Sequence, residues 1–299
     1  MKSLNSKARE NEFDCLVCGS EQHRFVGRKN QFDLWKCLHC QTIFTGDRAQ
    51  QEALKELYDH YYDGADFEIH PVVAHSLERV VFSFERFRIT SKILDIGFGE
   101  GGVLQIAERQ GWQCYGTEIS PRSLEYGKNQ DWIVTENADA DPRFSPQSFD
   151  VVTMIELLEH VPNPQQILQS AARWLRPGGL LYLTTPNARS LNQRVLGLEW
   201  SVVSPPEHLV LWTPKGLRHA LAKSGFQDLR IRTEGLNPYE ILAHWRSQKE
   251  AVNRNQTGMA LNTTFSSSLY RRALKRGINH LLSVLQIGDG LKVYATRND

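Results

Sequence analysis

The sequence has no excess of either charge and no long apolar run. Lys plus Arg number 35 against 34 Asp plus Glu, so the formal net charge over 299 residues is +1. The chain as a whole therefore lacks the excess of positive charge that is typical of nucleic-acid-binding proteins, although a local basic patch is compatible with this balance. No segment approaches the roughly 18 to 20 consecutive apolar residues that a membrane-spanning helix needs. The sequence therefore disfavours nucleic acid as a partner and predicts no transmembrane segment.

The first residues also lack the apolar core of a signal peptide, because Met1 to Glu12 are polar. We therefore expect a cytoplasmic protein. The content is 40% hydrophobic and 10% aromatic, enough to bury a sizeable core. We expect a small appendage over residues 1–48, a helical linker or lid over 49–90, and one large domain over 91–299.

Cysteine is scarce, and four of the five cysteines form two Cys-x-x-Cys pairs. Cys15 and Cys18 make the first pair, Cys37 and Cys40 the second, and eighteen residues separate the pairs. This spacing predicts a zinc ribbon, whose two knuckles supply four thiolates to one tetrahedral ion. A reducing cytoplasm makes disulfides the less favoured interpretation. Since four cysteines fill all four positions, the predicted zinc is structural and not catalytic.

Two segments between the cysteines and the main domain have helical spacing. Residues 50–62 form an amphipathic pattern that ends in Tyr58, Tyr61 and Tyr62. This helix either packs on the main domain or provides a tyrosine-rich lid over the site. A second helix is expected over residues 70–88, with a packing role.

Four glycines within six residues interrupt an apolar run at Ile93 to Gly102. The pattern predicts a buried strand over 92–96, a tight turn, and a helix over 103–109. Glycine lets the backbone approach a ligand closely, and the helix start offers unpaired N–H groups. The stretch therefore indicates a nucleotide-like ligand.

Strands and helices alternate after the glycine turn, which predicts a doubly wound α/β fold with a mostly parallel sheet. Further strands are expected near residues 113–119, 132–135, 149–154, 180–184, 227–233 and 290–295. Ligands of such folds bind at the carboxyl ends of the strands. The candidates there are Asp95, Glu118, Asp139, Glu156 and residues 185–187. Glu118 follows Asp95 by 23 residues, where an acid in nucleoside-binding folds grips the ribose hydroxyls.

Several stretches together resemble the class I S-adenosylmethionine-dependent methyltransferases. They are residues 94–101 with Glu118, Phe149 to Val152, Leu158 to Val161, and Leu175 to Gly179. The resemblance covers about residues 92–236 and implies a seven-stranded sheet and S-adenosylmethionine as cofactor. Residues 159–162, 208–214 and 224–226 are similar to the branch that contains ubiquinone-pathway O-methyltransferases and bacterial glycan- and natural-product-modifying enzymes.

The resemblance also implies roles for particular residues. Gly97, Gly99 and Gly101 would approach the methionine and ribose part of the cofactor, Glu118 would bind the ribose hydroxyls, and Asp95 would orient the turn. Where the family often shows an acid beside the adenine amino group, this chain has Ala138. Adenine would then be read by backbone around Ala138 and Asp139, and Glu156 would lie at the edge of the same site.

A dinucleotide-dependent dehydrogenase is the competing interpretation of the glycines. Its third glycine is expected three residues after Gly99, where Gly102 is present. The glycine pattern alone leaves both cofactors open, and the downstream stretches favour methyl transfer.

A hydroxyl acceptor must lose a proton, so O-methylation needs a general base. The candidates are Glu156, His160 and His208, and we favour His208 because it lies in a proline-rich loop before a capped helix. His160 is expected in a helical turn, where a structural hydrogen bond is its commoner use. Trp200 and Trp212 could line the acceptor pocket or pack in the core.

The Asn-Pro-Pro-Tyr motif of base-amino methyltransferases is absent, since Ile155 to Leu158 follow the fourth strand. We therefore expect a small-molecule, glycan or lipid-linked acceptor and O-methylation. An RNA-modifying enzyme that docks through its zinc ribbon is the alternative, and a non-catalytic cofactor-binding scaffold is a third hypothesis.

An insertion at about residues 237–288 separates the last two expected strands. Ala251 to Gly288 contain no Asp or Glu, and an apolar helical stripe runs through 269–285. The stripe belongs either to a cap helix over the acceptor pocket or to a basic amphipathic surface. Through residues 269–287 such a surface would contact a membrane or an anionic acceptor.

Overall fold

The computed structural model describes residues 13–46, 67–246 and 269–298, and of residues 269–276 it describes only the backbone. The expected linker helix at 50–62 with its three tyrosines lies outside the described residues, as do residues 253–268 of the expected insertion. So do the side chains of Arg271, Arg272, Lys275 and Arg276 in the expected basic surface.

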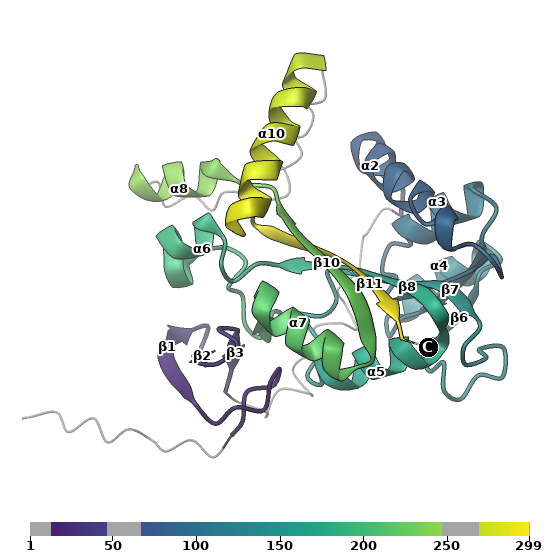
Figure 1. Cartoon of the computed structure of the whole chain (residues 1–299), viewed down its shortest axis with the longest axis horizontal. Helices are drawn as coiled ribbons and strands as arrows, with labels where there is room; N and C mark the ends of the chain where they lie inside the picture. Colours follow the sequence, from purple (N-terminus) through teal and green to yellow (C-terminus); the bar gives the residue numbers. More distant parts are fainter. Residues whose placement is uncertain (1–12, 47–66, 247–268, 299) are drawn as a thin grey trace, which may run out of the picture.

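A seven-stranded sheet forms the centre of the molecule (Figure 1), in the order β10-β11-β8-β7-β4-β5-β6. Only β11 runs antiparallel to its neighbours, and the other pairs are parallel. The strands are β4 Lys92–Ile96, β5 Gln113–Thr117, β6 Ile133–Thr135, β7 Phe149–Ile155, β8 Leu175–Pro186, β10 Phe226–Glu234 and β11 Gly290–Arg297. The predicted doubly wound, mostly parallel fold is confirmed.

Helices cover both faces of this sheet, as the near-continuous apolar strands require. Alternate residues of β4 separate the two sides: Ile93 packs with α2 and α3, whereas Leu94 packs with α5 and α7. The helices are α2 Pro71–Phe82, α3 Gly102–Arg109, α4 Pro121–Asn129, α5 Pro164–Trp174, α6 Leu191–Leu196, α7 Pro214–Lys223, α8 Pro238–Trp245 and α10 Leu269–Leu285, with short 3₁₀ turns η1 Glu85–Phe87 and η2 Gly197–Glu199.

Two boundaries differ from the sequence prediction. The helix expected over 70–88 ends at Phe82, where the hydroxyl of Ser83 donates to the carbonyl of Val80 and competes with the helical pattern. The expected turn before the fifth strand lies inside β8, which starts at Leu175. Gly178, with a φ of +68°, lets the strand pass through this irregularity.

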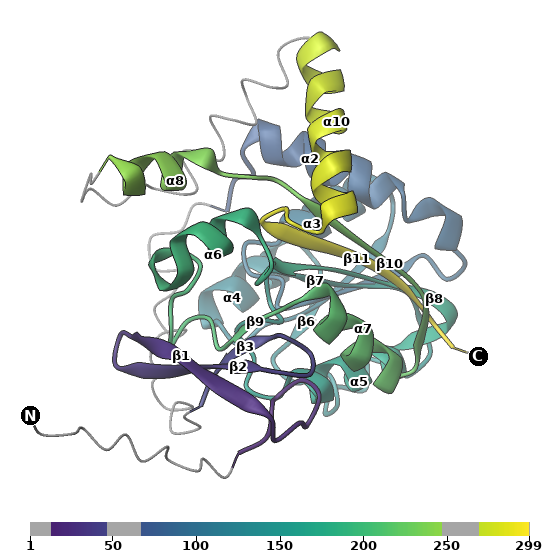
Figure 2. The same ribbon diagram turned by 60° about the vertical axis from the view of Figure 1, so that its left-hand side comes forward.

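A second, four-stranded antiparallel sheet has the order β1-β2-β3-β9. Its first three strands are β1 His23–Lys29, β2 Phe32–Cys37 and β3 Ile43–Thr45, but β9 Val210–Leu211 comes from the main domain. In the register of this pairing, Ile43 lies opposite Leu211 and Phe44 opposite Val210. Figure 2 shows β9 beside β3. Residues 13–46 are therefore built into the main domain through a shared sheet.

The insertion consists of α8 and α10, which project from the edge of the large sheet (Figures 1 and 2). The hydroxyl of Thr233 on β10 donates to the carbonyl of Leu282, and Leu282 is buried. Leu281, Val284 and Leu285 are 58%, 66% and 51% exposed. The apolar stripe is thus covered only in part. Over the described ranges, none of the helices has the length and hydropathy to cross a membrane.

Candidate active site and metal centre

The glycine turn after β4 depends on backbone conformations that favour glycine. Gly97, Gly99 and Gly101 have φ values of +67°, +51° and +74°. A Cβ on Gly97 would lie 2.7 Å from Leu157 Cδ1, and one on Gly101 would lie 2.6 Å from Trp132 Cζ3. Gly101 is also the N-cap residue of α3, and no side chain caps that helix. The turn and the first N–H groups of α3 therefore stand at the carboxyl edge of the sheet.

Glu118 follows β5 and reaches the glycine turn. Its carboxylate accepts from the backbone N–H of Gly99 at 2.9 Å and from those of Ile119 and Ser120 at 2.7 and 3.2 Å. The side chain is buried, and a carboxylate has about four acceptor directions, so some remain for a further donor. The acid and the turn, expected from sequence to meet, lie in direct contact.

Asp95 is buried at the end of β4 and accepts a hydrogen bond of 2.6 Å from the hydroxyl of Thr153 on β7. Burial raises the pKa of Asp95 to about 7, the Thr153 hydrogen bond opposes this, and the charge of Glu118 adds to it. The carboxyl group ties two central strands together directly beneath the glycine turn.

The remaining cofactor candidates follow β6 and β7. Ala138 is buried, whereas Asp139 is exposed and forms an ion pair with Arg173 of α5. Glu156 is exposed and has a φ of +48°, which bends the chain sharply as it leaves β7. The Asp139 carboxylate therefore already has a partner, whereas Ala138 offers only its backbone polar groups.

The structure brings the two candidate histidines together. The rings of His160 and His208 have centroids 4.7 Å apart at an interplanar angle of 76°. His160 Nδ1 lies 2.9 Å from the carbonyl oxygen of Glu207, and His208 Nδ1 lies 2.6 Å from that of Val202. A nitrogen this close to a carbonyl carries the proton, so both contacts define Nδ1–H donors. The turn after β7 and the loop before β9 meet at these rings.

Glu159 joins the histidines and was not among the sequence candidates. It is fully buried, and it accepts at 2.8 Å from the hydroxyl of Thr185 on β8. One Glu159 oxygen and one ring nitrogen each of His160 and His208 lie within 4.8 Å of one another. These residue types can also hold a metal ion. The sequence could have pointed to Glu159, because this residue directly precedes His160 in one of the stretches that carry the family resemblance.

Burial sets the protonation of this cluster. It raises the pKa of Glu159 well above its usual range, and the nearby Glu156 charge raises it further. Burial also lowers the pKa of His160 to about 4, and the positive form of His208 adds to this effect. His160 is therefore neutral at pH 7. The cluster is arranged around an uncharged imidazole.

The four paired cysteines converge at one point. Cys15 Sγ lies 3.6 Å from Cys40 Sγ, Cys18 Sγ lies 3.5 Å from Cys37 Sγ, and all four sulfurs are within 4.8 Å of one another. A tetrahedron with Zn–S bonds of about 2.3 Å has sulfur–sulfur edges of about 3.8 Å. A disulfide would need about 2.05 Å. The donor set and its spacing fit a zinc ion.

Hydrogen bonds link this cysteine cluster to the histidine loop. The hydroxyl of Thr213, which caps α7, donates to the carbonyl of Cys40 at 2.7 Å. The backbone N–H of Thr45 donates to Leu209, whose own N–H donates to the carbonyl of Glu159. A continuous path of contacts therefore connects the cysteines, β9 and the buried acid beside the histidines.

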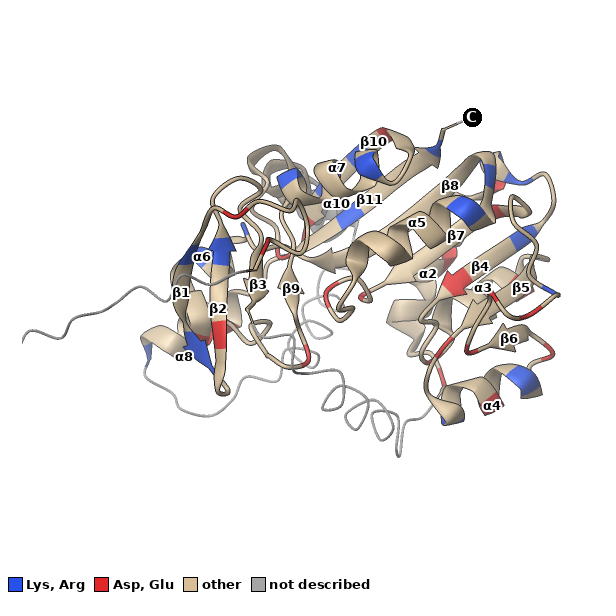
Figure 3. Ribbon diagram, turned by 90° about the horizontal axis from the view of Figure 1, so that it is seen from below, with Lys and Arg blue, Asp and Glu red and all other residues tan. Residues whose placement is uncertain are grey.

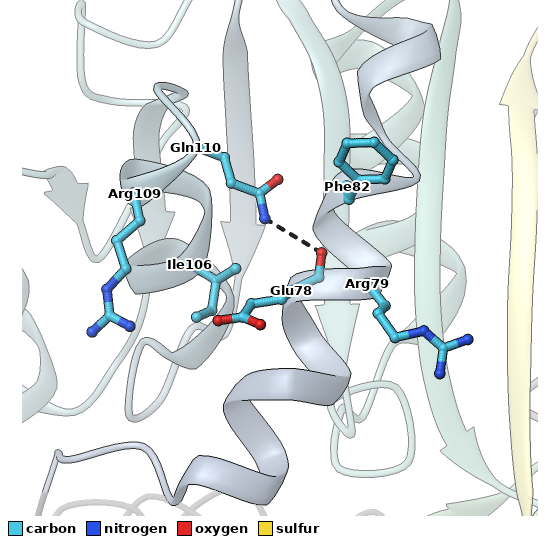
Figure 4. Close-up of a pocket in the computed structure, with 6 residues that line it drawn as sticks. All are labelled: Glu78, Arg79, Phe82, Ile106, Arg109 and Gln110. Carbon is cyan, nitrogen blue, oxygen red and sulfur yellow. Dashed lines mark hydrogen bonds between the residues drawn. The ribbon is translucent and has the colours of Figure 1, made fainter. Parts of the chain in front are cut away.

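Trp200 and Trp212 are both fully buried, so these side chains pack in the core and do not line a pocket. A groove of about 490 Å³ lies elsewhere, between α2 and α3 (Figure 4). Its lining residues are Glu78, Arg79, Phe82, Ile106, Arg109 and Gln110. This groove adjoins the second half of α3, away from the glycine turn at the start of that helix, and contains none of the predicted site residues.

The strand order, the glycine turn and the acid after the second strand define the class I methyltransferase fold. In the same fold, a SAM-dependent methyltransferase from Archaeoglobus fulgidus superposes with a TM-score of 0.52 at 18% identity, covering 81% of this chain and 99% of that one.

The sequence profile of the family described as "Methyltransferase domain" matches residues 58–231. A ubiquinone biosynthesis O-methyltransferase from Xanthomonas campestris pv. campestris is 32% identical over 196 residues, which cover 62% of this chain and 74% of that protein. One from Idiomarina loihiensis is 35% identical over 134 residues, 42% of this chain and 52% of that protein. The chain belongs to this methyltransferase family, and S-adenosylmethionine is its methyl donor.

Proposed function

We propose that the protein transfers a methyl group to a hydroxyl of a small-molecule or glycan-type acceptor, with His208 as general base. The observation that carries the proposal is the orientation of His208, fixed by its 2.6 Å contact with the carbonyl of Val202. The names of the relatives, ubiquinone biosynthesis O-methyltransferases, support O-methylation.

The glycine turn and Glu118 are the proposed cofactor site, and their geometry fits that role. When bound, S-adenosylmethionine supplies an electrophilic methyl group. The Glu118 carboxylate, already held by Gly99 and Ile119, would accept from the ribose hydroxyls, and Asp95 would keep the turn in place through Thr153. Backbone near Ala138 and Asp139 is proposed to meet the adenine.

His208 has the geometry of a base. With its proton on Nδ1 and directed at Val202, the lone pair lies on Nε2, which can take the proton of an acceptor hydroxyl. His160 is proposed as a positioning residue, because it is neutral and holds the carbonyl of Glu207 beside the His208 ring. Glu156, exposed at the same strand end, would face the acceptor.

We also propose that Cys15, Cys18, Cys37 and Cys40 hold a structural zinc ion. The sulfur spacing supports this, and four thiolates leave no position open for substrate. The ion would tie the first knuckle, which precedes β1, to the second, which joins β2 to β3.

RNA methylation is the second candidate function, with the ribbon as docking module. The balanced net charge of +1 counts against it, since phosphate contacts dominate such binding. The exposed side chains of Leu281, Val284 and Leu285 suggest a different partner, a membrane surface. Sedimentation with anionic vesicles tests this: protein left entirely in the supernatant would remove the membrane proposal.

The base is tested with His208→Gln, which keeps a polar side chain but cannot accept the proton. We expect kcat to fall by about 10² to 10⁴-fold with little change in S-adenosylmethionine affinity. His219→Gln is the matched control, because His219 is exposed on α7. Equal kcat values for the two variants would remove His208 from the mechanism.

The acceptor class is tested by incubating the protein and a methyl-tritiated donor with fractionated cell extract. We expect label in small molecules or glycans. Label confined to RNA would instead support RNA methylation, the second candidate function. If the protein binds the cofactor but labels no fraction, it would be a non-catalytic cofactor-binding scaffold.

A further inference from the structure

Four basic residues lie on elements that pack together where the small sheet contacts the main domain. Arg24 on β1 lies directly opposite Lys36 on β2, so the two side chains leave the same face of the sheet. Arg189 follows the carboxyl end of β8, and Arg194 lies on α6. Figure 3 shows basic positions on β1, β2 and α6.

Packing brings these elements together. Leu34, two residues before Lys36 and on the same face of β2, belongs to one buried cluster with Ala188 and Leu196. Those two residues flank the segment that carries Arg189 and Arg194. The segment that carries both arginines therefore packs beside the face of β2 that carries Lys36.

Among the residues that the structure describes, none of the four basic side chains has an ion pair or a side-chain hydrogen bond. Two acids on these elements have other partners: Asp33 of β2 pairs with Arg28, and Glu199 of η2 pairs with His244. Like charges directly opposite on paired strands destabilise a sheet. An unfavourable arrangement kept without local compensation is typical of a functional site.

The cluster lies within reach of the proposed acceptor site. Lys36 is in register with Ile43, and Ile43 with Leu211, so Lys36 is two strands, or about 10 Å, from β9. His208 lies just before β9. On the other side, Arg189 is four residues beyond Thr185, whose hydroxyl donates to Glu159, a span of at most about 14 Å.

We propose that Arg24, Lys36, Arg189 and Arg194 bind a phosphate or diphosphate group of the methyl acceptor. The proposal rests on the function proposed above and narrows its substrate class to phosphorylated hydroxyl compounds. Guanidinium groups bind phosphate oxygens in pairs, and an ammonium adds a point charge. The acceptor hydroxyl would then lie at His208, with its phosphate roughly 10 to 15 Å away.

The test uses the full-length protein and sodium pyrophosphate, titrated by calorimetry at low salt. Arg189→Gln/Arg194→Gln should weaken pyrophosphate binding by about tenfold or more, because two charged contacts are lost. Arg218→Gln/Arg230→Gln is the control, since it removes two exposed arginines of α7 and β10 and changes the net charge equally. Equal affinity in both variants, or no binding to the wild type, overturns the proposal.

Two further arms identify the source of the phosphate. Competition by a nucleoside diphosphate indicates a soluble phosphorylated acceptor, and competition only by vesicles containing phosphatidic acid indicates a lipid-linked one. A short RNA that binds far more tightly than pyrophosphate, and loses that binding in the double variant, would instead assign the cluster to nucleic acid. None of these binding measurements requires methyl transfer. The phosphate site can therefore be confirmed or refuted independently of the proposed function.

Discussion

Single residues near the glycine turn combine structural and ligand roles. Gly97 and Gly101 are required by their positive φ values and by the Leu157 and Trp132 side chains that occupy the space of a Cβ. Backbone conformation and packing are therefore enough to account for both glycines. Glu118 differs, since its buried carboxylate is held by backbone N–H groups at the rim of the turn. Substitution of Glu118 therefore tests cofactor binding most directly.

Glu118→Ala is expected to weaken S-adenosylmethionine binding by about 10- to 100-fold, because the acceptor for the ribose hydroxyls is lost. Isothermal titration measures this. Glu118→Gln, which retains one acceptor oxygen, should lose less, and Glu125→Ala on the exposed face of α4 should lose nothing. Unchanged affinity in Glu118→Ala would place the ribose elsewhere.

The raised pKa of Asp95 predicts that the stability of the folded protein depends on pH. Burial raises its pKa from 3.8 to about 7, so between these values the native state keeps a proton that the unfolded state releases. The free energy of unfolding therefore falls as pH rises from about 4 to 7, by up to about 4 kcal/mol from this group.

Urea unfolding of wild type and Asp95→Asn at several pH values checks this prediction. The amide can still accept from Thr153 but does not titrate, so Asp95→Asn should gain stability relative to wild type as the pH rises. Parallel curves for the two proteins would contradict the assignment.

Among the secondary-structure elements, strand β9, which joins the small sheet to the main domain, could not be predicted from the sequence. A two-residue strand has no periodicity, and Val210 and Leu211 acquire their partners only because β3 lies beside them. Local sequence was enough to predict the paired cysteines, the glycine turn and the capped helices, because each depends on residues that lie close together along the chain. The approach of His208 to Glu159 and His160 depends on tertiary contacts between distant segments, and sequence spacing cannot supply these.

Loss of a cysteine ligand tests the metal centre. Purified wild type should contain about one zinc per chain, and Cys18→Ser should contain almost none. Cys114→Ser is the control, because Cys114 lies in β5 and makes no contact with the cluster. Equal zinc content by atomic emission in both variants would refute the assignment.

Thr213→Val tests the link between the ribbon and α7. It removes both the hydrogen bond to the Cys40 carbonyl and the cap on the N–H of Gly216. The expected cost is about 1 to 3 kcal/mol of unfolding free energy, measured by urea titration. A stability equal to that of the wild type would show that these bonds contribute nothing net.

In the molecule as a whole, the cysteine-bearing region and the main domain share one hydrophobic core. Cys37, Cys40 and Phe44 belong to the same buried cluster as Trp212 and Leu217 of the main domain. The boundaries predicted from sequence, with an appendage at 1–48, carry no information about this joint packing. Composition shifts along a chain indicate where a segment begins, whereas shared burial depends on what packs against it.

Removal of residues 1–46 is therefore expected to give an insoluble or partly unfolded protein, because it uncovers β9 and the apolar surface around Trp212. Expression and circular dichroism check this. A soluble truncated protein that melts at the wild-type temperature and binds S-adenosylmethionine normally would show that the segment is an independent appendage.

The shared four-stranded sheet also has a consequence for biosynthesis. Strands β1 to β3 leave the ribosome long before residues 210 and 211, which complete their sheet. During that interval β3 is an open edge, a template for pairing with other chains. Late pairing between distant segments is slow and prone to aggregation. Early capture of a metal ion by the four cysteines would hold this edge in a compact, ordered hairpin until β9 arrives.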